Sequence, residues 1–363
     1  MKQDITALLE KAQTTSELTQ EELVSLLSLD ETQIPQLLAA ADAVRHKTVG
    51  DQVHLRGIIE FSSHCKQHCC YCGLRADNNQ IQRYRLSPEQ ILETARTAVQ
   101  VGYRTLVLQS GEDSAIPVET IAELTTEIKK LDVAVTLSCG ERSYETYQLW
   151  REAGADRYLI KQETADPALY RCLRPGHTLQ ERLQCQHWLK DLGYQVGSGC
   201  MIGLPGQTVE ILARDLQLMK EMRIDMSGMG PFIPHPQTPL KQNSSGSVWM
   251  TVKMLAVARL YMPWLLLPAT TALASMHPQG RELALRAGAN VIMPNVSPEE
   301  FRSLYQIYPG KLNTRNSMAD YRQEIVTLIE NEGRTVATDL VTVCTHRSIH
   351  KRRLLLCIIQ NPL

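Results

Sequence analysis

The stretch VHLRGIIEFSSHCKQHCCYCGLRADN (residues 53–78) decides the fold class, because it joins an apolar strand to a cysteine-rich loop. The run 53–61 is typical of a buried β-strand, and Cys65, Cys69 and Cys72 follow it with the spacing C-x3-C-x2-C. Chance placement of the chain's cysteines predicts roughly 0.007 such patterns, so the spacing indicates a site. Three thiolates suit a cubane iron–sulfur cluster with one iron left open.

Zinc is the alternative metal for this loop. A structural zinc site takes four ligands, and His64 or His68 could complete a Cys3His set. Each histidine adjoins a ligand cysteine, however, which makes simultaneous tetrahedral reach awkward. Cys70 lies next to Cys69, and we expect its side chain to point away from the metal and to pack.

Composition excludes several classes of partner. The net charge of −1 and the three Phe and four Trp residues argue against a nucleic-acid groove. No apolar run reaches the eighteen residues of a membrane span, and the charged N-terminus lacks a signal-peptide core. We therefore expect a cytoplasmic protein whose ten cysteines stay reduced and serve as ligands or core residues.

The order of elements predicts an α/β fold, a (β/α)8 TIM-type barrel. Helices are expected to end at Gly102, Gly154, Gly193 and Gly288, each followed by a strand, and one helix to begin at the N-cap Ser87. An open doubly wound sheet is the alternative. We expect a helical extension over 1–50, the barrel over 51–310 and a C-terminal extension over 311–363. The predicted strands are 53–61, 105–110, 134–139, 157–163, 195–203, 226–232, 264–272 and 290–295.

The cysteine loop resembles the signature of radical S-adenosylmethionine (SAM) enzymes, in which an aromatic residue, here Tyr71, precedes the last cysteine. The resemblance implies one [4Fe-4S] cluster whose open iron binds SAM, and reductive cleavage of SAM to a 5′-deoxyadenosyl radical. It further implies that SAM is held by residues at the strand ends. Those residues are Tyr71, Gln109, Gly111, Glu112, Ser138, Lys161, Glu163, Arg182 and Met201.

Nine further stretches narrow the resemblance to the HydE family of [FeFe]-hydrogenase maturases. They are FSSHCKQHCCYCGLRADN, LVLQSGED, AGADRYLIKQETADP, LRPGHT, GLPGQT, GMGPFIPHPQTPL, LPATTA, GANVIMPN and LYQIYPGK. The resemblance implies a long barrel cavity for a small-molecule or iron-complex substrate, and a role in assembling the diiron subcluster of the H-cluster. The implied cavity residues are Thr136, Met226, Thr270, Thr271, Tyr305 and Tyr308. On the residues alone, most of these would be ordinary inward-facing barrel positions.

The implied protein partners are an electron donor of the flavodoxin or ferredoxin type, the scaffold GTPase HydF and the tyrosine lyase HydG. The protein itself is expected to be a monomer.

Two departures from the family bear on these expectations. The positions of a second, C-terminal cluster hold Asn313, Tyr321 and Glu324, so no second cluster is expected. The family's Arg-His pair reads Lys161-Gln162, and lysine lacks the two-pronged guanidinium. A related activity, methylornithine synthase or biotin synthase-like chemistry with Cys139 or Cys200 near the cavity, therefore stays open. So does a non-catalytic iron–sulfur scaffold.

Overall fold

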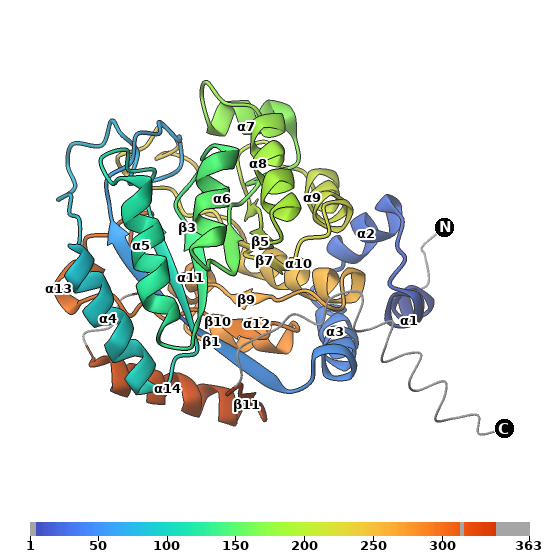
Figure 1. Cartoon of the computed structure of the whole chain (residues 1–363). Helices are drawn as coiled ribbons and strands as arrows, with labels where there is room; N and C mark the ends of the chain where they lie inside the picture. Colours follow the sequence, from blue (N-terminus) through green and yellow to red (C-terminus); the bar gives the residue numbers. More distant parts are fainter. Residues whose placement is uncertain (1–4, 313–315, 339–363) are drawn as a thin grey trace.

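Eight parallel strands form the barrel in this computed structural model, which describes residues 5–312 and 316–338 (Figure 1). The strands lie side by side in chain order, and the last of them pairs with the first. They are β1 (Gln52–Ser62), β2 (Thr105–Ser110), β3 (Ala134–Ser138), β4 (Arg157–Leu159), β5 (Gln195–Ser198), β7 (Met226–Ser227), β9 (Pro268–Ala269) and β10 (Val291–Ile292).

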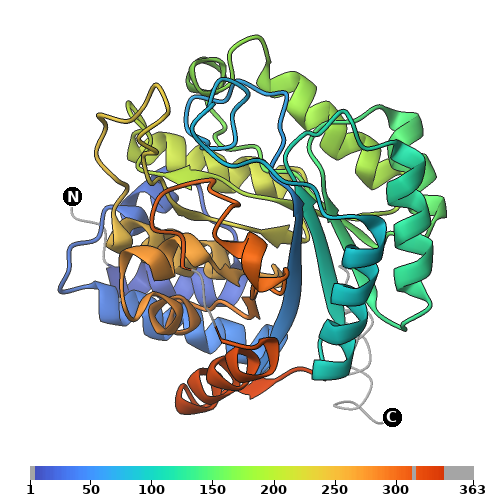
Figure 2. The same ribbon diagram turned by 90° about the vertical axis from the view of Figure 1, so that its left-hand side faces the viewer.

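The barrel closes between β7 and the residues that lead into β9. Met226 forms a parallel bridge with Leu266, and the Ser227 amide donates to the Leu266 carbonyl over 3.0 Å. This closure excludes the open doubly wound sheet and confirms the predicted barrel. Because all strands are parallel, their carboxyl ends share one rim, and the loop after β1 rises above that rim (Figure 2).

Helices alternate with the strands and cover the outside of the barrel. All four predicted terminator glycines have positive φ, between +80° and +107°, as helix C-termini require. Ser87 caps its helix with a capping box to Gln90, as expected. These helices are α4 (Pro88–Val101), α5 (Val118–Lys129), α6 (Tyr144–Glu152), α7 (Pro167–Leu173), α8 (Leu179–Asp191), α9 (Val209–Glu221), α10 (Val248–Tyr261), α11 (Thr271–Met276), α12 (Gly280–Arg286) and α13 (Glu299–Arg302).

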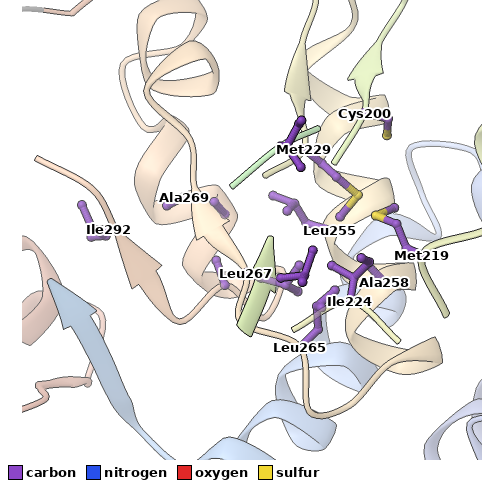
Figure 3. Close-up of a cluster of buried hydrophobic side chains, with 14 of the residues drawn as sticks. Cys200, Met219, Ile224, Met229, Leu255, Ala258, Leu265, Leu267, Ala269 and Ile292 are labelled. Carbon is purple, nitrogen blue, oxygen red and sulfur yellow. The ribbon is translucent and has the colours of Figure 1, made fainter. Parts of the chain in front are cut away.

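The N-terminal helices α1 (Ile5–Thr15), α2 (Gln20–Leu27) and α3 (Ile34–Val49) form a second layer outside α9 and α10. Lys253 on α10 donates to the Leu29 carbonyl over 2.9 Å. Every residue of α10 from Thr251 to Tyr261 is buried, because the barrel covers one side of the helix and the N-terminal helices cover the other. Figure 3 shows part of the core between barrel and helices, where Met219 of α9 and Leu255 of α10 lie near Leu267.

Short elements complete the rim and the base. β6 (Met201–Ile202) pairs with β8 (Gly230–Pro231) above the ends of β5 and β7. After residue 310, α14 (Met318–Asn331) packs on α4, and β11 (Thr335–Val336) pairs with the first residues of β1. No helix in the described part of the chain is both long and apolar enough to cross a membrane.

Candidate active site

The three cysteines of the loop line one cavity of about 320 Å³ at the carboxyl rim of the barrel. Burial raises the pKa of the Cys69 thiol to about 12, and the neighbouring Cys65 adds to this shift. The pKa of Cys72 is raised for the same reasons. Three thiols close enough to disfavour one another's ionisation are a set that a bound cation would stabilise as thiolates.

Strand β2 supplies the support for this loop. The Glu112 amide donates to the Cys65 sulfur over 3.4 Å, a bond that favours the thiolate form. A Cβ atom on Gly111 would lie 2.3 Å from the His64 carbonyl oxygen, so only glycine allows this approach.

Nine residues predicted to hold SAM line the same cavity as the cysteines. They come from the loop, from the ends of β2, β3 and β4, from α8 and from β6. The structure thus brings together Tyr71, Gln109, Gly111, Glu112, Ser138, Lys161, Glu163, Arg182 and Met201. The barrel rim brings these residues from six elements into one cavity, an arrangement that the sequence alone does not show.

Glu163 has the most constrained backbone of this group, with φ of +66°. Its amide donates to the Gly199 carbonyl over 3.0 Å, its carbonyl accepts from the Met201 amide over 3.0 Å, and its carboxylate accepts from the Tyr71 hydroxyl over 3.2 Å. Burial raises its pKa, while Lys161 and Arg182 oppose that shift. Left-handed backbone in a non-glycine residue is typical of functional sites, and this carboxylate is placed to accept hydroxyl donors.

Three residues that we did not predict hold the charged groups in place. Gln67, from the cysteine loop, donates to the Glu112 carboxylate over 2.6 Å, and Arg174 lies 3.5 Å from the same carboxylate. Glu141 accepts from the Nε atom of Arg182 over 2.6 Å. Arg174 belongs to the LRPGHT stretch, and Glu141 follows the end of β3. These two positions in the sequence were the signals that could have marked them as site residues.

Arg182 is buried and is only partly satisfied by these contacts. Its Nη1 atom donates to the Lys161 carbonyl over 3.0 Å, whereas its Nη2 atom has no hydrogen-bond partner among the described residues. A buried donor without a partner costs about 1–3 kcal/mol. An anionic group in the cavity would remove that cost, which fits the predicted contact with the SAM carboxylate.

The predicted substrate residues divide into two sets. Thr270, Tyr305 and Tyr308 line the cavity, but Thr136, Met226 and Thr271 do not. An apolar floor explains the difference.

Met226, Leu266 and Val291 fill the barrel, with Leu159 and Met293 against them, and Leu159 also borders the cavity. Met226 lies within this floor and accepts a hydrogen bond from Arg56 over 2.7 Å. Thr136 is fully buried on β3, and Thr271 starts α11. The cavity at the rim therefore includes three of the six residues that the resemblance implied for the substrate.

Among residues 5–312 and 316–338, the other cysteines and the histidines lie outside this cavity. Cys139 and Cys200 are buried in the core between barrel and helices, where Cys200 is seen near Met229 (Figure 3). Cys70 does not line the cavity, in agreement with its expected outward orientation. His68 pairs with Asp77 at the surface over 2.9 Å.

Of the positions of the family's second cluster, Asn313 lies outside the described residues. Tyr321 is buried on α14, where its hydroxyl accepts from Arg281 over 2.5 Å, and Glu324 is on the same helix near Asn316.

Comparisons with known proteins agree with this geometry. A model of the radical SAM superfamily matches residues 59–219. The [FeFe] hydrogenase maturase subunit HydE of Thermotoga maritima is 52% identical over 297 residues, which cover 82% of this chain and 85% of that protein. The 3-methylornithine synthase of Methanosarcina acetivorans is 33% identical over 280 residues, covering 76% and 79%. The crystal structure of methylornithine synthase (PylB) superposes with a TM-score of 0.83 at 30% identity, covering 91% of this chain and 97% of that one.

A closed barrel with a three-cysteine loop at its carboxyl rim, together with the superfamily match, defines a radical SAM enzyme. Within that superfamily, the chain belongs to the HydE family of [FeFe]-hydrogenase maturases.

Proposed function

We propose that this protein cleaves SAM reductively at a [4Fe-4S] cluster and uses the 5′-deoxyadenosyl radical to help assemble the diiron subcluster of the [FeFe]-hydrogenase H-cluster. The observation that carries the proposal is the shared cavity of three cysteines and nine predicted SAM residues, in a chain 52% identical to a HydE protein. The function of that relative supports the substrate assignment, and the cavity supports the chemistry.

The residues present fit both absent groups. Cys65, Cys69 and Cys72 would hold three irons of the cluster, which supplies the electron that breaks a carbon–sulfur bond of SAM. Glu112, held by Gln67, would accept from the amine of SAM, and the unsatisfied Nη2 atom of Arg182 would pair with its carboxylate.

Glu163 would accept from the two ribose hydroxyls, with Tyr71 fixing its carboxylate. Met201 and the residues of β8 offer apolar surface for the adenine. These contacts orient the bond to be broken and exclude water from it, which protects a reactive radical.

The lower part of the cavity would bind the substrate. Thr270, Tyr305 and Tyr308 line the cavity and would supply hydroxyl groups to the substrate. A small molecule or a small iron complex would bind there, beside SAM.

We further propose a single cluster, because Asn313, Tyr321 and Glu324 offer no thiolates at the family's second site. The protein would act as a monomer in the reducing cytoplasm, receive electrons from a flavodoxin- or ferredoxin-type donor, and work alongside HydF and HydG. The eight cysteines in the described part of the chain are free thiols, which supports a reducing compartment.

A maturation assay tests the substrate assignment. The protein, HydF and HydG are incubated anaerobically with SAM and apo-hydrogenase, and hydrogen evolution is measured. We expect activation that depends on this protein, and none with its Cys72→Ala variant. SAM cleavage without activation, accompanied by formation of methylornithine, would instead support the related synthase activity.

A further inference from the structure

A second hollow, of about 230 Å³, lies at the outer surface of the cysteine loop. Cys65 lines both this hollow and the inner cavity. Cys69 and Cys72 line the inner cavity but not this hollow. Electron tunnelling weakens steeply with distance. A cluster held by Cys65 would therefore be approached most closely from this hollow, through the sulfur of that cysteine.

Positive charge faces outward around this hollow. Lys66 is exposed, and its ammonium group has no partner among the described residues. The Arg83 guanidinium donates to four backbone carbonyls of the loop, so no carboxylate neutralises it. Arg85 remains 41% exposed, although it pairs with Asp113 over 2.6 Å.

The acidic groups of the same hollow are turned inward. The Asp113 side chain is 3% exposed and is held by Arg85 and by the Ser62 hydroxyl. Glu112 is buried and is held by Gln67. A partner approaching from solvent therefore meets a positive rim on a chain whose net charge is −1.

We propose that an acidic one-electron carrier protein docks on this hollow and reduces the cluster by way of Cys65. The inference rests on the proposed function and names the surface that its electron donor uses. One electron leaves the reduced carrier, which is oxidised, and enters the cluster, which is reduced. No bond forms or breaks, and no proton moves.

A neighbouring hollow provides a matched control. It is larger, about 570 Å³, and is lined by Arg75, Asp77 and the exposed Lys241, but by none of the three ligand cysteines. If the carrier responded only to general surface charge, or docked at this second hollow, reversal of Lys241 would slow reduction.

The test uses the reconstituted holoenzyme and an acidic ferredoxin as the probe. Lys66→Glu and Ser114→Glu place negative charge in the proposed hollow, and Ser114→Lys adds positive charge, without removing any contact that holds the loop. Ferredoxin binding is measured by calorimetry, and cluster reduction by stopped-flow absorbance at low ionic strength.

We expect the double variant Lys66→Glu/Ser114→Glu to bind ferredoxin roughly tenfold more weakly than the wild type. Its cluster should be reduced by ferredoxin roughly tenfold more slowly. Ser114→Lys should increase both quantities, Lys241→Glu should leave them unchanged, and 0.5 M salt should abolish the differences. Wild-type binding and reduction by the double variant, or slow reduction by Lys241→Glu, would overturn the proposal.

Dithionite, a small reductant that needs no docking surface, separates this inference from the proposed function. All of these variants should retain wild-type iron content and dithionite-driven SAM cleavage. If the wild type itself fails to cleave SAM with dithionite, the proposed function fails, whereas loss of cleavage in the double variant alone would show damage to the site and contradict the docking role.

Discussion

At the scale of single residues, Glu163 combines left-handed backbone with a buried carboxylate. Replacement by glutamine keeps the shape but removes the charge, and charge-assisted hydrogen bonds are worth about 1.5–3 kcal/mol. We expect Glu163→Gln to weaken SAM binding by about 10- to 100-fold. Equilibrium dialysis of the holoenzyme with labelled SAM measures this directly.

Tyr71→Phe is the matched control, because it removes only the hydroxyl that donates to Glu163. The loss of SAM affinity in Tyr71→Phe should be several-fold smaller than the loss in Glu163→Gln. Equal affinity of Glu163→Gln and the wild type would remove Glu163 from the SAM site.

Asp215 on α9 should make stability depend on pH. It is fully buried, and its carboxylate accepts from the Ala165 amide over 2.6 Å and from Gln162 over 3.1 Å. Burial raises its pKa from 3.8 to about 8. Because the folded pKa lies above the unfolded value, folding favours the protonated form, and stability from this group is lost as pH rises from about 4 to 8.

Asp215→Asn removes this titration and keeps an acceptor oxygen. The melting temperature of the variant should therefore rise relative to that of the wild type between pH 5 and pH 8.5. If the melting temperatures of the variant and the wild type changed in parallel across this pH range, Asp215 would be ionised at no cost in the folded protein.

The sequence allowed prediction of residues that line the cavity, but not of the residues that hold their side chains in place. Cys65, Glu112 and Glu163 follow strands, so their place at the rim could be inferred. Gln67 and Glu141 act through partners 45 and 41 positions away. Such pairings depend on how the loops fold over the rim, and no local pattern encodes them.

At the scale of elements, the junction after β3 is constrained by its neighbour after β2. Gly140 has φ of +80°, and a Cβ atom there would lie 1.9 Å from Cγ of Glu112. We expect Gly140→Ala to displace Glu112 and to weaken SAM binding by roughly tenfold or more, the order expected when a charged hydrogen bond is lost.

Gly193→Ala provides the comparison, because Gly193 has the same φ with no atom within 4 Å of the added carbon. Both variants should lose about 1–2 kcal/mol of stability from left-handed backbone, and only Gly140→Ala should lose SAM affinity. Equal SAM affinities would contradict the steric account.

The cysteine loop has little regular structure and is held largely by Arg83. This guanidinium donates to the carbonyls of Ser63, Leu74, Arg75 and Asn78 over 2.5–3.0 Å. We expect Arg83→Ala to cost about 3 kcal/mol of stability and to lower iron uptake on reconstitution. A buried bond to a charged donor is worth about 1.5–3 kcal/mol, but Arg83 is only half-buried, so water replaces part of what its four bonds contribute.

Arg83→Lys should recover only part of this loss, since an ammonium group lacks the planar fork. Exposed Arg96 on α4 is the control position, and Arg96→Ala should take up iron like the wild type. Full iron uptake by Arg83→Ala would show that the cysteines order the loop by themselves.

At the scale of the whole molecule, the barrel could be predicted because strands, helices and terminator glycines recur along the chain. The barrel closure through Leu266 and the apolar floor of Met226, Leu266 and Val291 could not. Both depend on which side chains meet across the interior. Thr136 and Met226, which we expected in the cavity, do not line it.

The replacement of the family's Arg-His by Lys161-Gln162 also has a structural explanation at this scale. Gln162 is buried and joins Asp215 and Ser198 behind the rim, and Lys161 lines the cavity. Gln162 thus supports the rim from behind, and Lys161 presents its charge to the cavity. The substitution changes the hydrogen-bond donors within the cavity, because a lysine ammonium group replaces the planar guanidinium of arginine.

Cys65, Cys69 and Cys72 are proposed to hold the single cluster at which SAM is cleaved. The most direct test of this proposal is release of 5′-deoxyadenosine after anaerobic reconstitution and dithionite reduction, measured beside iron content. The wild type and Cys70→Ala, which changes a neighbouring thiol outside the cavity, should bind about four irons per chain and release 5′-deoxyadenosine. Cys69→Ala should do neither, and SAM cleavage by Cys69→Ala at the wild-type rate would contradict the account.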